Sequence, residues 1–142
     1  MLTYNELIRT YNELSAMGHY ERLQNTKSAY ARLESLLQEA MGFGPGYFAA
    51  TRFACALLAA DGQLTYAEHE MFRKFASSSC TYEELYDSVA KISKNFKGAL
   101  EIATTHGRDV RFVAGYLAAA IYAEKGALGE NEKTIFKLLA EA

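Results

Sequence analysis

Apolar side chains recur every three or four residues along nearly the whole chain, which is the spacing of one face of an α-helix. In the first segment Tyr4, Leu7, Tyr11 and Leu14 follow this pattern, and polar side chains fill the positions between them. No segment shows the sustained alternation with β-branched residues that is typical of a strand. Only one of the 142 residues is proline, so little interrupts helices. The pattern predicts an all-α bundle of about eight helices.

Two glycine-containing breaks divide the first part of the chain: one lies within the N-terminal part, and the other separates it from the rest. Gly18 interrupts the first periodic stretch, since glycine costs about 1 kcal/mol inside a helix, and a second stripe then runs to Met41. Residues 1–41 are therefore expected to form an N-terminal helical hairpin. The segment 42–46 holds three glycines and the proline, and is expected to be a hinge before a second part at 47–142, the two forming one compact unit. A phosphate-binding loop is disfavoured there, because no strand precedes the segment and no Gly-Lys-Ser/Thr follows it.

Four tyrosines lie on the apolar stripes of the expected N-terminal hairpin, together with several leucines. Left in water, they would form a larger apolar patch than soluble proteins usually expose. We therefore expect these stripes to pack onto the rest of the bundle, or onto a second copy of the protein. The tyrosines are Tyr4, Tyr11, Tyr20 and Tyr30.

From Phe48 onwards the sequence repeats itself with an offset of 64 residues. Each copy has an alanine-rich helix, a glycine turn with a following leucine, and an amphipathic helix with a glutamate in its first turn. Small side chains let helices approach closely, so the two alanine-rich helices are expected to pack together at the centre. Two pseudo-repeated helical hairpins are thus predicted, with helices at 81–93 and 96–105 between them. Ten residues coincide with their counterparts: Phe48, Ala50, Ala54, Ala56, Ala59, Gly62, Leu64, Glu68, Phe72 and Ala76 match Phe112, Ala114, Ala118, Ala120, Ala123, Gly126, Leu128, Glu132, Phe136 and Ala140.

The first of the two glycine turns carries acidic side chains. Thr65 and Glu68 have the spacing of a capping box, which the start of a helix explains without any ligand. Asp61 is less well explained, because an acid at a helix C-terminus faces the negative end of the helix macrodipole. A hard divalent ion held between Asp61 and Glu68 would relieve that cost.

The turn has the pattern Ala-Ala-Asp-Gly-x-Leu-Thr-x-x-Glu, which returns in weaker form one repeat later. This pattern resembles the tellurite-resistance TerB family and its TerB-like relatives, over residues 47–142. Members of that family are all-helical bundles of two related halves, and their acidic residues are associated with divalent metal. The resemblance implies metal ligands at Asp61, Glu68 and Glu132, with Ca²⁺, Mg²⁺ or Mn²⁺ as the ion. The second turn departs from the pattern, since Lys125 stands where the motif has aspartate and opposes a bound cation.

Charge and composition exclude several classes of protein. Fifteen Lys and Arg against 17 Asp and Glu give a net charge of −2, which supplies no field for a phosphate backbone, so no nucleic-acid partner is expected. The longest apolar or small-residue run, 112–123, falls short of the roughly 20 residues that span a bilayer, and the chain does not begin like a secretory signal. Cys55 and Cys80 lack metal-ligand or disulfide spacing, so both are expected to be reduced thiols in a cytoplasmic protein.

No catalytic motif is recognisable, so enzymatic activity is not expected. Glu68-His69-Glu70 lacks the second histidine of a zinc-hydrolase helix. The leading hypothesis is a bacterial, cytoplasmic TerB-like module that acts in a stress response by association with a protein partner or with itself, with a divalent ion at its acidic turn. A metal-ion sensor or sequestering protein is the alternative, and an enzyme of unrecognised type comes third.

Overall fold

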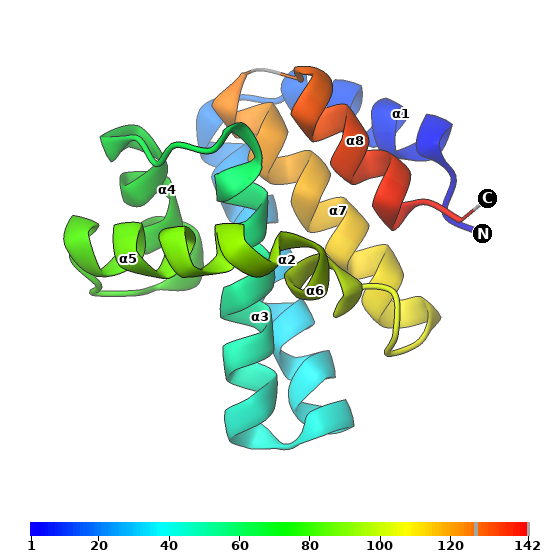
Figure 1. The fold of residues 1–142 in the computed structure, drawn as a ribbon. Helices are drawn as coiled ribbons and strands as arrows, with labels where there is room; N and C mark the ends of the chain where they lie inside the picture. The colour runs from blue at the N-terminus through cyan, green and yellow to red at the C-terminus, as the bar shows by residue number, and fades with distance from the viewer. Residues whose placement is uncertain (127, 142) are drawn as a thin grey trace.

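The computed structural model describes residues 1–126 and 128–141, and of Asp61 the backbone only. Over these residues the chain is an all-α bundle without a β-strand (Figure 1), as the periodicity predicts. None of the helices in this part of the chain is both long enough and apolar enough to cross a membrane. The elements are α1 (Tyr4–Ser15), α2 (His19–Met41), α3 (Phe43–Leu58), the 3₁₀ turn η1 (Ala59–Asp61), α4 (Tyr66–Ala76), α5 (Tyr82–Ile92), the 3₁₀ turn η2 (Ser93–Asn95), α6 (Phe96–Glu101), α7 (Arg108–Lys125) and α8 (Glu130–Leu139).

Helix α2 is the centre of the bundle, because it packs along both α3 and α7 and also contacts α4. Its Tyr30, Leu33 and Leu37 are buried in the core. The expectation that the two alanine-rich helices, α3 and α7, pack along each other is therefore wrong for the described residues. These two helices meet near their C-terminal ends, where the Tyr122 hydroxyl donates to the Leu57 carbonyl at 3.2 Å.

Burial on nearly every side explains the alanine-rich composition of α3 and α7. Residues 53–58 of α3 and 117–122 of α7 are fully inaccessible to solvent. A helix that is apolar all round is a core helix. Neighbours cover both of them, since α2, α5 and α6 lie against α3, and α1, α2 and α8 lie against α7.

The segment 42–46 is a tight connection between α2 and α3. Gly42 has a φ of 98°, a conformation that favours glycine, and α3 begins at the next residue. A Cβ atom on Gly46 would lie 2.4 Å from the backbone nitrogen of Gln38, so glycine is required for the two helices to approach this closely. In place of the expected hinge there is thus a close helix contact, and α3 starts at Phe43 rather than at Tyr47.

The N-terminal stripe packs within the chain. Helix α1 lies on α7 and α8, whereas α2 enters the core, so α1 and α2 are connected at Gly18 but bury their apolar faces in different places. The two chain ends lie side by side (Figure 1), and the Glu141 amide donates to the Leu2 carbonyl at 2.7 Å. Of the four tyrosines, Tyr20 stays largely exposed and Tyr30 is buried.

The two glycine turns share their local geometry. Gly62 and Gly126 have φ values of 80° and 75°, and in each turn a glutamate accepts the N-cap amide of the next helix, from Thr65 to Glu68 and from Gly129 to Glu132. The wider packing differs, because α8 lies on α7 whereas α4 lies on α2. The two-fold repeat of whole hairpins stays a prediction.

Between the turns, α5 starts at the expected capping box, where Thr81 and Glu84 satisfy each other's backbone amides. Helix α6 ends at Glu101, before the expected Thr105. Gly107, with a φ of 97°, is the N-cap of α7 rather than the end of α6.

Candidate functional site

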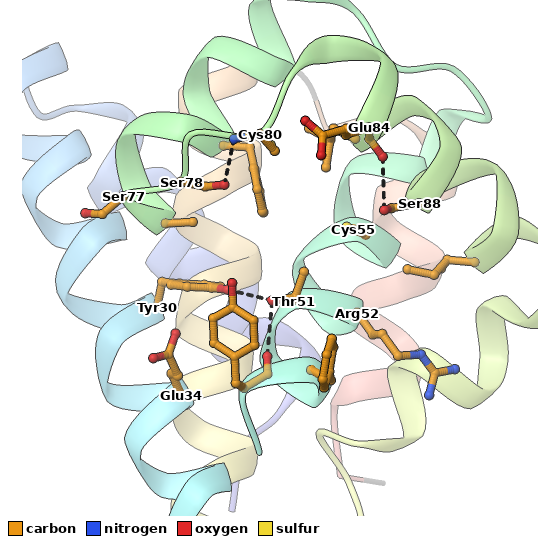
Figure 2. Close-up of a pocket in the computed structure, with 16 residues that line it drawn as sticks. Tyr30, Glu34, Thr51, Arg52, Cys55, Ser77, Ser78, Cys80, Glu84 and Ser88 are labelled. Carbon is orange, nitrogen blue, oxygen red and sulfur yellow. Dashed lines mark hydrogen bonds between the residues drawn. The ribbon is translucent and has the colours of Figure 1, made fainter. Parts of the chain in front are cut away.

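A cavity with a volume of about 570 Å³ lies between α2, α3, the end of α4 and α5 (Figure 2). Helix α4 packs on α2, and α5 packs on α3. The connection 77–81 therefore crosses from the α2–α4 pair to the α3–α5 pair, and the cavity lies between the two pairs. The volume is that of a typical ligand or side-chain pocket. Its floor is formed by the buried residues Tyr30, Cys55, Phe72, Leu85 and Ile92.

Two exposed aromatic rings of α3 form the rim of this cavity. Phe48 is 66% exposed and Tyr47 is 47% exposed, and their rings meet edge to face with centroids 5.7 Å apart. Both follow the tight turn at Gly42, which places the start of α3 beside the end of α2. Large aromatic groups left in water at the mouth of a cavity are typical of binding surfaces.

Polar groups on the cavity floor hold their protons at neutral pH. The Thr51 hydroxyl donates to the Tyr47 carbonyl at 3.1 Å, so the Tyr30 hydroxyl is the donor in its 3.3 Å contact with Thr51. Burial raises the pKa of Tyr30 to about 12. Burial likewise raises the pKa of the Cys55 thiol to about 12. The floor is therefore uncharged under physiological conditions.

Charged side chains occur only at the edge of the cavity lining. Glu34 and Arg52 lie on opposite sides of it in Figure 2, and Glu84 lies beyond, on α5. Hydrogen bonds from the backbone amide and then the hydroxyl of Thr81 lower the pKa of Glu84, so this carboxylate is ionised at neutral pH. The cavity thus combines a neutral floor with a charged edge.

The acidic turn predicted to hold a metal is built differently from a cation site. Glu68 is buried, and its Oε1 accepts the Thr65 amide at 2.8 Å. Its Oε2 lies 2.9 Å from the Nζ of Lys125, at the end of α7. The ammonium group of Lys125 therefore already neutralises this carboxylate, and a divalent ion that binds Glu68 would have to displace it.

The other two predicted ligands do not complete a site within the described residues. The buried Glu132 accepts the Gly129 amide at 3.5 Å as part of its own helix start, and the side chain of Asp61 lies outside the described residues. Among the side chains that are described, no group of three or more His, Cys, Asp or Glu could hold a metal ion. A metal at Asp61, Glu68 and Glu132 stays a prediction, which calorimetric titration with Ca²⁺, Mg²⁺ and Mn²⁺ tests.

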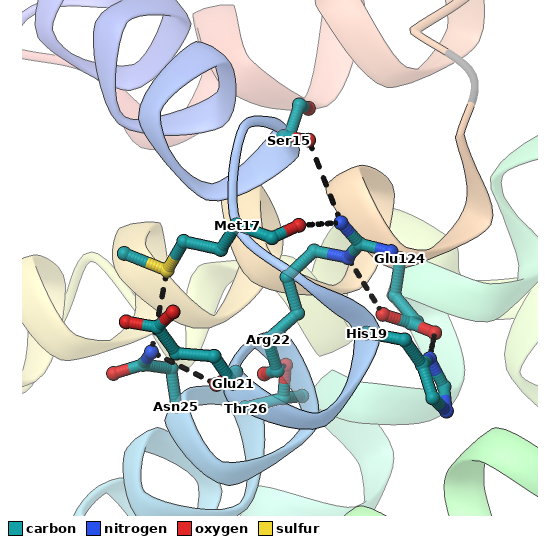
Figure 3. A network of polar contacts seen from close by, with 8 residues as sticks. All are labelled: Ser15, Met17, His19, Glu21, Arg22, Asn25, Thr26 and Glu124. Atoms are coloured by element: carbon teal, nitrogen blue, oxygen red, sulfur yellow. Dashed lines mark hydrogen bonds and ion pairs between the residues drawn. The ribbon is translucent and has the colours of Figure 1, made fainter.

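Next to Lys125, a polar network ties the start of α2 to the end of α7 (Figure 3). Glu124 accepts from the Nε of Arg22 at 2.9 Å and contacts His19. Arg22 also donates to the Met17 carbonyl and, at 3.4 Å, to the Ser15 carbonyl. The network therefore holds the connection between α1 and α2 in place, and we assign it a structural role.

Neither the cavity nor this network could be predicted from the sequence. The cavity residues come from four helices and one connection, and the network joins residues more than 100 positions apart. The exposed aromatic pair at Tyr47 and Phe48 is the one local signal, because Tyr47 and Phe48 follow the glycine turn on the polar side of an otherwise apolar helix.

Comparisons with known proteins found no relative: no family model, no curated protein and no solved structure matches this chain.

Proposed function

We propose that this chain is a TerB-like protein-association module of the bacterial cytoplasm, and that the cavity described above receives an apolar side chain of its protein partner. The carrying observation is the cavity itself, with its uncharged floor of Tyr30, Cys55, Phe72, Leu85 and Ile92 and its exposed rim of Tyr47 and Phe48. The TerB-like assignment and the stress-response setting rest on the motif at residues 59–68, and the two free thiols support the location.

The geometry suits an anchor residue of a protein interface. Fully burying one large apolar side chain contributes about 1.5–3 kcal/mol, and such anchors in closed pockets dominate binding energies. Phe48 and Tyr47 would lose their contact with water at the same time. The charged groups at the edge, Glu34 and Arg52, remain available for the polar rim that surrounds such anchors.

The state of the floor residues supports association over covalent catalysis. A nucleophilic cysteine needs a lowered pKa, whereas that of Cys55 is raised to about 12. The Tyr30 hydroxyl, with a pKa of about 12, is an equally poor base at neutral pH. Neither group is prepared for proton transfer or attack.

Site-specific photo-crosslinking in cells of the source organism tests this proposal. A benzophenone amino acid replaces Phe48 at the rim, and in a parallel strain it replaces Tyr20, which is 75% exposed on α2 and lies outside the cavity lining. We expect a discrete adduct with one protein from position 48 and none from position 20. Mass spectrometry identifies the partner.

A cavity-filling variant distinguishes docking in the cavity from chance proximity. Ser88→Trp fills the cavity from the exposed face of α5, and Ser35→Trp adds the same ring on α2 outside the lining. The adduct should disappear with Ser88→Trp and persist with Ser35→Trp, while both variants keep the wild-type circular dichroism. An adduct that persists with Ser88→Trp would refute the proposed docking site.

A further inference from the structure

A row of three tyrosine rings lies on the surface where the N-terminal ends of α4 and α5 meet. Tyr66 and Tyr82 are stacked with centroids 4.3 Å apart, and Tyr86 follows at 6.0 Å from Tyr82. The two outer tyrosines are largely exposed, Tyr66 to 74% and Tyr86 to 51%. None of these rings lines the cavity, so this tyrosine row is a surface of its own.

The central ring of the row is held in place by its neighbours. The Tyr82 hydroxyl donates to the Leu64 carbonyl at 2.8 Å. The His69 and Tyr82 rings are nearly perpendicular with centroids 5.9 Å apart, and the His69 Nε2 donates to the Cys80 carbonyl at 2.8 Å. Because these contacts already order its central ring, the tyrosine row loses little conformational entropy when a ligand binds.

Carboxylates give the tyrosine row a negative surrounding. Glu83 and Asp87 are exposed one turn apart on α5, each next in sequence to a tyrosine of the row. Within the described residues no Lys, Arg or His lies within ion-pair distance of either carboxylate. Two like charges at this spacing destabilise a helix slightly, and a bound cation would remove that cost.

The state of Tyr82 agrees with this negative surrounding. Its pKa is raised first by burial, then by Tyr66 and Tyr86, and then by the carboxylates of Glu68 and Glu83. The capping glutamates Glu68 and Glu84 satisfy the amide ends of α4 and α5, so these helix ends offer little to an anion.

We propose that the tyrosine row binds the guanidinium group of an arginine-bearing segment of a partner protein. A planar guanidinium stacks on the faces of aromatic rings and forms paired hydrogen bonds with carboxylates, and Tyr66, Tyr86, Glu83 and Asp87 supply both. Stacking of nucleic-acid bases is disfavoured, because the same carboxylates repel phosphate. The proposal goes beyond the cavity and shares no residue with it.

Fluorescence anisotropy with three labelled heptapeptides tests the proposal on the full chain. The peptides alternate glycine with arginine, with lysine, or with citrulline, which keeps the shape of arginine without its charge. We expect binding in the order arginine, lysine, citrulline, with the citrulline peptide not measurably bound. Amide chemical shifts in the NMR spectrum should change at residues 66 and 82–87.

Variants separate stacking from general attraction to an acidic protein. Tyr86→Ala should weaken the arginine peptide about two- to fivefold, and Tyr20→Ala, at another exposed tyrosine, should leave it unchanged. Glu83→Gln/Asp87→Asn should weaken it about fivefold, while Glu13→Gln/Glu39→Gln makes the same change of net charge elsewhere and should have little effect. Each variant is checked for wild-type circular dichroism.

Four results would overturn the proposal: an arginine peptide that does not bind, equal affinity for arginine and lysine peptides, equal weakening by the two double variants, or no effect of Tyr86→Ala. Because the assay contains no crosslinking partner and its variants change no residue of the cavity lining, its outcome is independent of the function proposed above.

Discussion

At the scale of single residues, the structure changes the interpretation of Lys125. In the sequence it interrupts an expected cation site, and in the structure it is the cation, with its Nζ 2.9 Å from the buried Glu68 carboxylate. Removing one member of a buried ion pair leaves the other charge without a partner, which costs far more than the pair contributes over an apolar substitute.

We expect Lys125→Met to lower the free energy of unfolding by about 3 kcal/mol, measured by urea denaturation at pH 7. Glu68→Gln/Lys125→Met should recover more than half of this loss, because glutamine still serves in the capping box and carries no charge. Lys133→Met is the control, since Lys133 faces Glu130 at 3.9 Å on the surface and its loss should cost less than about 0.5 kcal/mol. Equal losses for Lys125→Met and Lys133→Met would contradict the role assigned to Lys125.

The buried thiol predicts how stability depends on alkaline pH. The pKa of Cys55 is raised from 9.0 to about 12, so the unfolded chain releases this proton before the folded chain does. The protonated Cys55 thiol therefore contributes fully to the free energy of unfolding below pH 9. This contribution is lost as the pH rises towards 12, by about 1.4 kcal/mol per pH unit. Tyr30 adds a similar loss between pH 10 and about 12.

Urea denaturation between pH 8 and 11 measures this loss. The Cys55→Ala variant should be less stable at pH 8, because it leaves a small void, and its stability should fall less steeply above pH 9 than that of the wild type. Parallel curves for the two proteins would show that the Cys55 thiol does not titrate as its burial requires.

At the scale of elements, the contact between α2 and α3 depends on one missing side chain. Gly44 and Gly46 lie in the same first turn of α3, but their surroundings are opposite. Apart from its own helix backbone and its chain neighbours, a Cβ atom on Gly44 would meet no atom within 4 Å, whereas one on Gly46 would overlap the backbone of Leu37 and Gln38. Backbone cannot move aside as a flexible side chain can, so the helices would have to separate.

Gly46→Ala should therefore lower the free energy of unfolding by about 2 kcal/mol. Gly44→Ala should change it by less than about 1 kcal/mol, because the gain through the unfolded state is opposed by contact of the new Cβ with the ring of Pro45. Thermal unfolding followed by circular dichroism measures both. If the two variants shift the midpoint in the same direction by similar amounts, the close approach of α2 and α3 at Gly46 is wrong.

At the scale of the whole molecule, the N-terminal 46 residues are part of the core. Helix α2 packs along both α3 and α7, and α1 also packs on α7. Residues 47–142 alone would leave these apolar helix faces in water. The chain should therefore unfold in one cooperative transition, as small single domains do.

A fragment of residues 47–142 should lack a cooperative unfolding transition and near-ultraviolet circular dichroism, because its helices lose the surface against which they pack. The full chain, studied in the same buffer, should show both. A fragment that unfolds cooperatively would instead support the hinge and the separate second part expected from the glycines at 42–46.

The sequence by itself determined the local structure of the chain. Capping boxes at Thr65 with Glu68 and at Thr81 with Glu84 start their helices as expected, because side chain and amide are three residues apart. Glycine breaks and the 3.6-residue period then defined most helices and the all-α class.

The tertiary structure alone decided which apolar face meets which. Similar stripes on α1, α2 and the alanine-rich helices do not specify their partners, since burial of apolar area is non-directional. Backbone contact at Gly46 and the pairing of Lys125 with Glu68 select among the possible arrangements, and both act between residues whose proximity exists only after folding. The cavity arises in the same way, from walls that four helices and one connection bring together.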